Sequence, residues 1–350
     1  MGRNRCLSGH SRPQLRFFDP TIWIHQTVGE TAQLLACSGC GTDQVFYCRQ
    51  HEGVNLCRKC FVESVETKVR RTITKRRMLE PRDVIIVALS GGKDSVALLQ
   101  ILWKLERRFP PARLVALTVD EGISGYRNEA IAISREICGA LNIGHVVVTF
   151  DELFGLTMDD VASRRNELQP CSYCGVLRRK ALNEGARRLR ATKVATAHNL
   201  DDEGQTALLN VMHGDTERIL SVPNKTEGRF IPRVKPLAEV PERETTLYAY
   251  ATGTRFQAIP CPYGNEALRG DIRVMLNRLE LKHPGLKYTI CKSVDKLSQS
   301  INATRRSRIL RACSACGDPT PNDECQACKM LKALKPNPSR TCQSTSLKTA

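Results

Sequence analysis

Hydrophobic residues alternate between two spacings in the middle of the chain. Residues 84–89 form a continuous apolar run, which is typical of a strand buried on both faces of a sheet. The apolar residues of 95–107 then recur with helical spacing. The same patterns predict strands at 114–119, 146–150 and 194–197 and helices at 127–141, 176–189 and 202–212. This alternation predicts an α/β fold with a parallel sheet, whose ligands lie at the carboxyl ends of the strands.

The first strand and the first helix are joined by residues 90–95, which read Ser-Gly-Gly-Lys-Asp-Ser. Two glycines let a phosphate approach the backbone, and the start of the helix presents free N–H groups and a positive dipole end. Lys93 adds a mobile cation. The spacing differs from that of the G-x-x-x-x-G-K-[ST] loop and is the signature of enzymes that cleave ATP to AMP and pyrophosphate. The alternative is a glycine-rich turn that binds no ligand.

Two acidic segments follow other predicted strands. Residues 198–203 follow the fourth strand, and their carboxylates could hold the Mg²⁺ that accompanies ATP phosphates. Residues 120–122 follow the second strand, where Val119 could face the adenine. Either segment alone could instead be a helix N-cap, because Asp is favoured there. Since all three segments lie at one end of one sheet, together they favour a nucleotide site.

Sixteen cysteines without a secretory signal favour metal or redox chemistry over disulfides. Eight of them form two sets of paired Cys-x-x-Cys, and each set has the spacing of a structural zinc site. We therefore predict two structural Zn²⁺ ions. The ligands are Cys37, Cys40, Cys57 and Cys60 in the first set and Cys313, Cys316, Cys325 and Cys328 in the second. Cys48 and His51 lie inside the first set and are alternative ligands.

A fifth Cys-x-x-Cys pair, Cys171 and Cys174, has no second pair nearby. One further candidate is Cys261, in the segment Ile-Pro-Cys-Pro-Tyr. Three thiolates leave one coordination position open, which suits an iron–sulfur cluster with one accessible iron or a redox pair with a third cysteine. The alternatives are a buried structural trio and a third zinc site.

The chain carries a formal net charge of +17 at pH 7, with basic clusters at 68–77, 178–190 and 305–311. Such a surface favours a polyanionic partner, with nucleic acid first, over a merely solvated basic face. No apolar run approaches the roughly 20 residues of a membrane helix. No apolar segment follows the basic N-terminus, as a secretory signal requires. We therefore expect a cytoplasmic location without membrane association.

These patterns divide the chain into seven expected regions. They are a basic, disordered leader at 1–32, a zinc finger at 33–64, a basic linker helix at 65–82, a catalytic ATP pyrophosphatase domain at 83–240, a helical continuation with Cys261 at 241–305, a second zinc finger at 306–330 and a disordered tail at 331–350.

The order of these motifs resembles the tRNA 2-thiouridine synthetase family of the PP-loop superfamily, which includes the cytosolic thiouridylase catalytic subunit. The resemblance covers roughly residues 35–330. It implies an adenine-nucleotide alpha hydrolase-like fold and an ATP-dependent tRNA sulfurtransferase. This enzyme adenylates C2 of a tRNA uridine and replaces the oxygen with sulfur. The sulfur would come from the thiocarboxylate of a ubiquitin-like carrier protein, and the enzyme would form a homodimer or a heterodimer with a second thiolase subunit.

The resemblance also assigns roles to individual residues. It implies that Cys171, Cys174 and Cys261 hold a 4Fe-4S cluster or pass on a persulfide, and that Lys93 and Asp94 act with them in catalysis. The implied ATP and Mg²⁺ contacts are Ala88, Ser90, Gly91, Gly92, Lys93, Asp94, Ser95, Val119, Arg178, Ala197 and Asp202. The family often has Gly where this chain has Ala197, whose methyl group is small. The chain alone leaves open whether the target is the wobble uridine or one in the T-loop.

Two other functions remain open on the sequence. One is another AMP-forming tRNA-modifying enzyme with the same loop, such as a lysidine synthetase, which would not need the three cysteines. The other is a non-catalytic, zinc-dependent RNA-binding protein, which would not need an intact loop at 90–95.

Overall fold

The computed structural model describes residues 36–107, 112–164, 168–215, 231–264, 267–302 and 310–334. The predicted leader at 1–32 lies outside the described residues, as do residues 335–350 of the tail predicted at 331–350. The first four residues of that tail, 331–334, are helical and not disordered. Most of the basic cluster at 305–311 also lies outside them.

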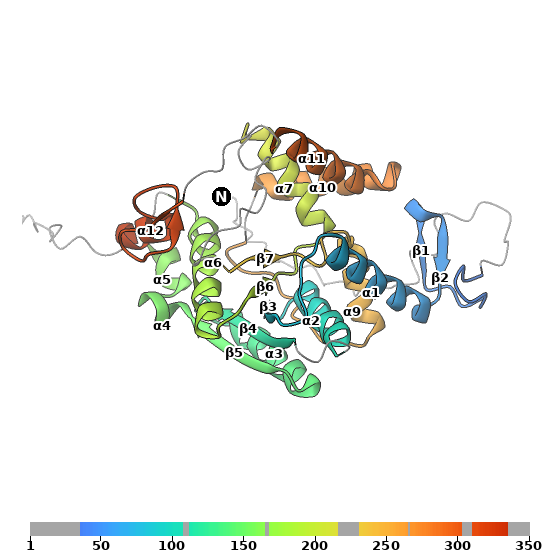
Figure 1. Cartoon of the computed structure of the whole chain (residues 1–350), viewed down its shortest axis with the longest axis horizontal. Coiled ribbons are helices and arrows are strands. Elements are labelled where there is room, and N and C mark those ends of the chain that lie inside the picture. The colour runs from blue at the N-terminus through green and yellow to red at the C-terminus, as the bar shows by residue number, and fades with distance from the viewer. Residues whose placement is uncertain are drawn as a thin grey trace, which may run out of the picture.

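A five-stranded parallel sheet forms the centre of the molecule (Figure 1). Its strands, from edge to edge, are β5 (Gly144–Thr149), β4 (Arg113–Asp120), β3 (Val84–Ala88), β6 (Lys193–Ala195) and β7 (Arg233–Val234). The α/β fold with a parallel sheet is therefore confirmed, and β7 is a strand that the sequence patterns did not reveal. Chain order reverses at β3, so the loops after β3 and β6 border the crevice where such sheets bind ligands.

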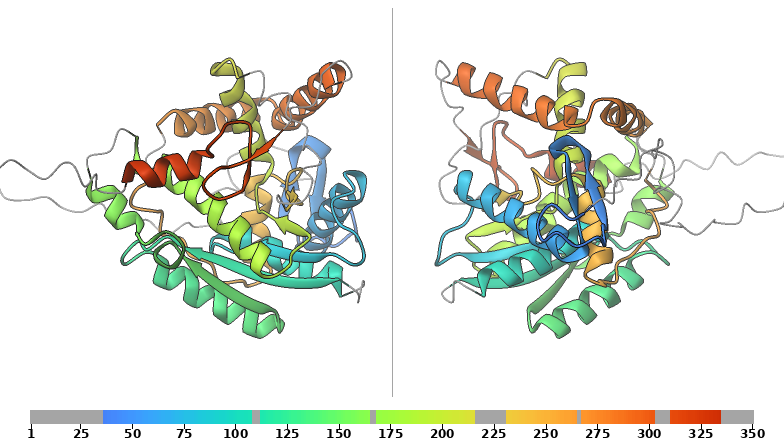
Figure 2. Two further views of the ribbon diagram at one scale, coloured as in Figure 1. Left: turned by 60° about the vertical axis from the view of Figure 1, so that its left-hand side comes forward. Right: turned by 90° about the vertical axis from the view of Figure 1, so that its right-hand side faces the viewer.

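Helices cover both faces of this sheet (Figure 2). The first face packs against α2 (Lys93–Glu106) and α3 (Arg127–Leu141), with α9 (Glu242–Ala251) and α1 (Arg58–Lys75) behind α2. The second face packs against α6 (Pro170–Arg188), which also contacts α4 (Phe150–Phe154), α5 (Met158–Ser163) and α12 (Gln326–Leu334). Because side chains alternate along a strand, Ile85 and Val87 join the first core, whereas Ile86 joins the second.

Three further helices form a separate group above the sheet in Figure 1. They are α7 (Leu200–Met212), α10 (Ala267–Lys282) and α11 (Leu286–Asn302), and α7 contacts both of the others. A buried ion pair between Lys287 and Asp201 joins α11 to the start of α7. None of the helices in the described residues contains an apolar stretch that could span a lipid bilayer.

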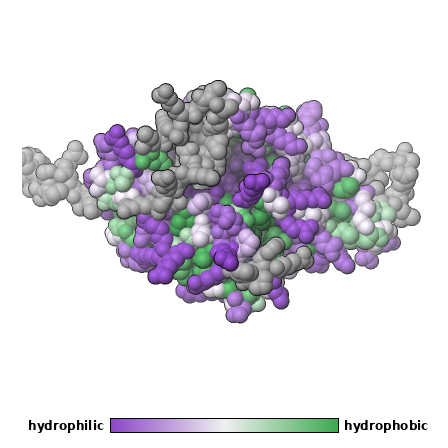
Figure 3. All heavy atoms as spheres, in the orientation of Figure 1, coloured by the Kyte–Doolittle hydropathy of each residue, from purple (hydrophilic) through white to green (hydrophobic). Residues whose placement is uncertain are grey.

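Small cysteine-rich modules lie on opposite sides of the sheet (Figure 1). The first contains β1 (Tyr47–Arg49), the 3-10 helix η2 (Gln50–Glu52) and β2 (Val54–Leu56). The second contains β8 (Arg311–Ala312), β9 (Pro319–Thr320) and α12. On the face drawn in Figure 3, hydrophilic residues predominate and hydrophobic residues gather in small groups.

Two helices begin earlier than their periodicity predicts. Cys57 caps α1, so this helix grows directly out of the first module, and it buries Phe61, Val65 and Val69 in the core. The second case is α6, which starts at Pro170, so Cys171 and Cys174 lie in its first turns and not in the preceding loop. Proline is favoured at the first helical position, because its missing N–H would be unpaired there anyway.

Candidate active site and cysteine clusters

The loop at residues 90–95 wraps around the hydroxyl group of Ser95 at the start of α2. This hydroxyl donates to the carbonyl of Gly92 at 2.8 Å and accepts from the amide of Ser90 at 3.1 Å. Gly91 has a φ of +80°, and a Cβ atom there would lie 2.8 Å from the carbonyl oxygen of Ala130, so glycine is required. The backbone is thus shaped around the N-terminal end of a helix, which favours an anionic ligand.

Lys93 lies between two carboxylates beside this loop. Its Nζ atom is 2.6 Å from Oδ2 of Asp94 and 2.9 Å from Oε1 of Glu242. The other oxygen of Asp94 accepts hydrogen bonds from Asn199, at 3.3 Å, and from the hydroxyl of Thr245. Glu242 and Thr245 belong to α9, and the sequence analysis missed both because about 150 residues separate them from the loop.

Asp202 completes the acidic group and also caps a helix. It forms a reciprocal capping box with Asn199, the N-cap residue of α7, so this segment does cap a helix as well as supplying a carboxylate. Burial, with the nearby carboxylates of Asp94 and Glu242, raises the pKa of Asp202 to about 6. Three carboxylates around one lysine leave excess negative charge. Carboxylate oxygens are the protein ligands that Mg²⁺ prefers, so the residues fit the predicted Mg²⁺.

Glu121 joins the nucleotide loop to the predicted sulfur site. It is 1% exposed, and its two oxygens form ion pairs with Arg127 Nε at 2.7 Å and with Arg178 Nε at 2.6 Å. Arg127 in turn donates to the carbonyl of Ser90 at 3.3 Å and to that of Val119. Glu121 follows a predicted strand, but no local sequence pattern indicates this bridge.

The three cysteines predicted to act together approach one another from two elements. Cys171 Sγ lies 2.7 Å from the carbonyl oxygen of Tyr263, in the turn that carries Cys261. Arg178 donates to Sγ of Cys174 at 3.1 Å. Burial raises the pKa of Cys174, and Cys261 is near enough to add to this effect. The α6 helix and the 261–264 turn therefore bring all three thiols to one place.

The spacing of these thiols distinguishes them from the other cysteine groups. Among the described residues, the two outer tetrads have all their ligand atoms within 4.8 Å of one another, whereas the trio does not. The trio is therefore too widely spaced, as it stands, to hold a single zinc ion. A set of three cysteine thiolates around a wider space fits an iron–sulfur cluster.

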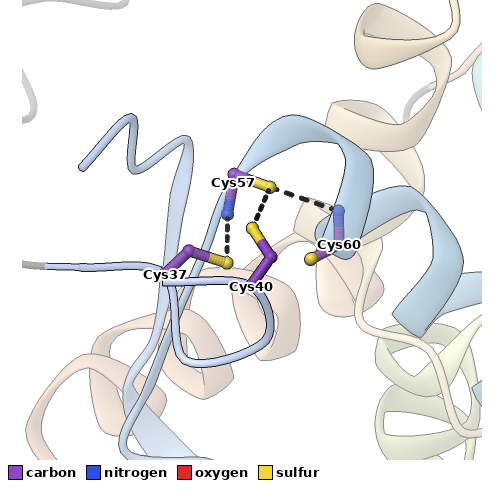
Figure 4. Close-up of side chains that lie close together, drawn as sticks. All are labelled: Cys37, Cys40, Cys57 and Cys60. Carbon is purple, nitrogen blue, oxygen red and sulfur yellow. Dashed lines mark hydrogen bonds between the residues drawn. The ribbon is translucent and has the colours of Figure 1, made fainter. Parts of the chain in front are cut away.

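The first outer tetrad is formed by Cys37, Cys40, Cys57 and Cys60 (Figure 4). The amide of Cys57 donates to Sγ of Cys37 at 3.2 Å, and this bond is the main reason why the pKa of Cys37 falls to about 6. The sulfur atoms of Cys40 and Cys57 are 3.7 Å apart. Cys48 and His51, the alternative ligands, lie outside this group. Four converging thiolates fit a structural Zn²⁺ ion.

The second tetrad, of Cys313, Cys316, Cys325 and Cys328, repeats this arrangement. The amide of Cys325 donates to Sγ of Cys313 at 3.3 Å. Next to it, Asp318 forms ion pairs with Lys180 at 2.8 Å and with Arg187 at 2.9 Å, both on α6. The C-terminal module is thereby attached to the helix that carries Cys171 and Cys174.

The remaining predicted nucleotide contacts border the same edge of the sheet. Ala88 is the last residue of β3, and Ala197 lies two residues beyond β6. Val119 is 4% exposed, and its side chain packs in the core of the second face, so any contact with a nucleotide would come from its main chain.

The chain is similar to several known proteins. Residues 62–279 match the family model described as a PP-loop domain. The chain is 39% identical over 321 residues to the tRNA 2-thiolation protein NcsA of Haloferax volcanii, covering 86% of this chain and 99% of that protein. It is 37% identical over 307 residues to the cytoplasmic tRNA 2-thiolation protein 1 of Bos taurus, with coverage of 85% and 87%.

A solved structure shares the fold. It is described as the U34-tRNA thiolase NcsA from Methanococcus maripaludis with its 4Fe-4S cluster. The TM-score is 0.76 at 31% identity, covering 86% of this chain and 96% of that one. The parallel sheet and its loop thus define a PP-loop nucleotide-binding domain. The chain belongs to the family of tRNA 2-thiolation proteins.

Proposed function

We propose that this chain is a tRNA sulfurtransferase, which uses ATP to replace the C2 oxygen of a uridine with sulfur. The observation that supports this most strongly is the chain of contacts from Ser90 through Arg127, Glu121 and Arg178 to Cys174. These contacts run from the main chain of the loop at 90–95 to the thiol of Cys174, which supports a shared site for ATP and sulfur. The names of the relatives support tRNA as the substrate.

The reaction has two steps in this proposal. First, the C2 oxygen of uridine attacks the α-phosphorus of ATP, pyrophosphate leaves, and the uridine gives up its N3 proton. Second, a hydrosulfide attacks C2, a C–S bond forms, and the C–O bond breaks to release AMP. The proton of the hydrosulfide replaces the one lost from N3, so the product is 2-thiouridine.

The residues around the loop serve the first step. The N–H groups at the start of α2 and the Lys93 cation would stabilise the charge that builds up on the phosphates. Asp94, Asp202 and Glu242 would hold a Mg²⁺ ion, which would supply positive charge beside the ATP phosphates. Ser90 and Ser95 fix the shape of the loop through their hydrogen bonds.

The cysteine trio serves the second step. Cys171, Cys174 and Cys261 would hold a 4Fe-4S cluster, and one iron without a cysteine ligand would offer a position for inorganic sulfur. The Arg178 guanidinium lies beside Cys174 and is half exposed, and its charge favours an anionic sulfur nucleophile. A persulfide on one of these cysteines is the alternative chemistry.

Three further assignments belong to this proposal. The solved relative is described as a U34-tRNA thiolase, which supports the wobble uridine as the target. A ubiquitin-like carrier with a C-terminal thiocarboxylate would supply the sulfur, and the enzyme would act as a homodimer or with a second thiolase subunit. A cytoplasmic location is supported by the names of relatives such as the bovine protein.

Mass spectrometry of tRNA nucleosides from cells lacking this protein tests the proposal. We expect 2-thiouridine derivatives to disappear from position 34 and to return with the wild-type gene but not with Lys93→Met. Unchanged thiolation at position 34 would refute the proposed substrate. Loss of a different modification would favour another AMP-forming PP-loop enzyme.

A further inference from the structure

The three cysteines of the trio differ in how firmly the fold holds them. Cys171 and Cys174 belong to the first turns of α6, so helical hydrogen bonds fix their backbone. Cys261 lies in a turn, closed by a 3.0 Å hydrogen bond from the amide of Gly264 to the carbonyl of Cys261. The position of the third thiol relative to the other two therefore depends on the contacts that this turn makes with the rest of the fold.

Tyr263 supplies these contacts in two directions. Its carbonyl oxygen lies 2.7 Å from Sγ of Cys171, which brings the turn against the start of α6. Its hydroxyl donates a hydrogen bond to Oδ1 of Asp159 at 2.8 Å. This bond is the main reason why the pKa of Tyr263 is raised. Among the described residues of the turn, this is the one hydrogen bond that joins two side chains.

Asp159 is itself held in place by the rest of the fold. It lies on α5, which is capped by the reciprocal box of Thr157 and Asp160. Its second oxygen accepts from the amide of Ser124 at 3.0 Å, in the turn after β4. Thr157 packs closely against Gly122: a Cβ atom added to Gly122 would lie 2.7 Å from the side chain of Thr157. The carboxylate of Asp159 is thus held in place between the turn after β4 and the 261–264 turn.

We propose that Tyr263 is a positioning residue, whose hydroxyl, bound to Asp159, holds Cys261 at the distance from Cys171 and Cys174 that a shared cluster requires. This inference rests on the proposed role of the trio. It assigns a function to α5, a short helix next to α6 that hydrophobic periodicity does not predict. The phenol group does not touch the reacting atoms, so its effect passes through the position of Cys261.

Tyr263→Phe tests the inference, because it removes only the hydroxyl. In anaerobically purified protein, we expect iron to be lost to a chelator about tenfold faster than in the wild type, as expected for a lost hydrogen bond to a charged group. ATP binding in the absence of tRNA should be unchanged. Tyr250→Phe is the control, since Tyr250 is 62% exposed on α9 and away from the trio; its iron loss should match the wild type.

Asp159→Ala removes the other partner of the same hydrogen bond, and it is tested alone and combined with Tyr263→Phe. The inference can then still be tested if one of the variants folds poorly. The double variant should lose iron no faster than the more affected single variant, because both changes remove the same contact. Equal rates of iron loss in the wild type and in Tyr263→Phe would overturn this inference and leave the proposed function standing. A wild-type protein that contains no iron or acid-labile sulfide would overturn the cluster assignment and, with it, this inference.

Discussion

Glu121 and Arg178 form the ion pair that connects the two halves of the site, with Oε1 and Nε 2.6 Å apart. Glu121 directly follows β4, and Arg178 lies on α6, one helical turn after Cys174. Since the other oxygen of Glu121 pairs with Arg127, one buried carboxylate orients two arginines. One of these supports the ATP loop, and the other faces a cysteine.

Removing the charge of Glu121 should therefore destabilise the fold. Glu121→Gln leaves buried Arg127 without its counter-charge, and we expect the free energy of unfolding to fall by about 3–5 kcal/mol. Chemical denaturation measures this. Glu136→Gln is the control, because Glu136 is 62% exposed and its pairing with Arg255 is at the surface. It should change the free energy of unfolding by less than about 1 kcal/mol. Equal effects would contradict the bridging role.

Lys93 should contribute to ATP cleavage and little to folding. Lys93→Met removes the cation next to the phosphates, and we expect the rate of pyrophosphate release to fall about 10²- to 10³-fold. Lys104→Met is a matched control on the same helix, where Lys104 pairs with Glu66 away from the loop. A rate close to the wild type in Lys93→Met would remove Lys93 from the nucleotide site.

Asp202 should make Mg²⁺ binding dependent on pH. Its pKa of about 6 lies above the ordinary value of 3.8, so between these values the folded chain keeps a proton that the unfolded chain has lost. The contribution of Asp202 to the stability of the metal-free protein therefore falls as pH rises through this window.

Mg²⁺ must displace that proton. Below about pH 6, we expect the apparent Mg²⁺ affinity, measured by the Mg²⁺ dependence of AMP formation, to weaken by up to about tenfold per pH unit. Asp202→Asn should bind Mg²⁺ more weakly and lose this pH dependence. A wild-type affinity that stays constant from pH 5 to pH 7 would exclude Asp202 as the titrating ligand.

The outer tetrads should each hold one zinc ion. Elemental analysis of wild-type protein should find two zinc ions per chain, one for each tetrad. Cys316→Ser should reduce the zinc content to one ion per chain. It should also break the ion pair between Asp318 and Lys180 of α6, because a structural zinc site folds only with its metal. Cys291→Ser, which changes a cysteine of α11 outside both tetrads, should retain two. Two zinc ions in Cys316→Ser would refute the second site.

The sequence predicted the parts of the fold that have strong periodicity or fixed spacing. The strand predicted from the apolar run at 84–89 is β3, which ends at Ala88, and the helix at 127–141 appears as predicted, because a strand buried on both faces and an amphipathic helix have clear patterns. The cysteine tetrads were also predicted, since a tetrahedral metal site imposes Cys-x-x-Cys spacing.

Shorter elements and distant contacts could not be predicted in this way. Strand β7 has two residues and α5 has six, too few to show a period. Glu242 and Thr245 reach Lys93 and Asp94 through the packing of α9 on α2. Their positions follow from the tertiary fold, which no local pattern of side chains encodes.

The most direct test of the account is thiolation by purified Cys171→Ala, assayed anaerobically with tRNA, ATP, Mg²⁺ and sulfide. Mass spectrometry of the nucleosides would measure 2-thiouridine, and ATP binding would be measured on the same samples. We expect thiolation to be abolished while ATP affinity stays within about twofold of the wild type, because Cys171 contacts the carbonyl of Tyr263 and takes no part in the contacts that support the loop at 90–95. Thiolation at the wild-type level in Cys171→Ala would contradict the central claim that the cysteine trio performs the sulfur step.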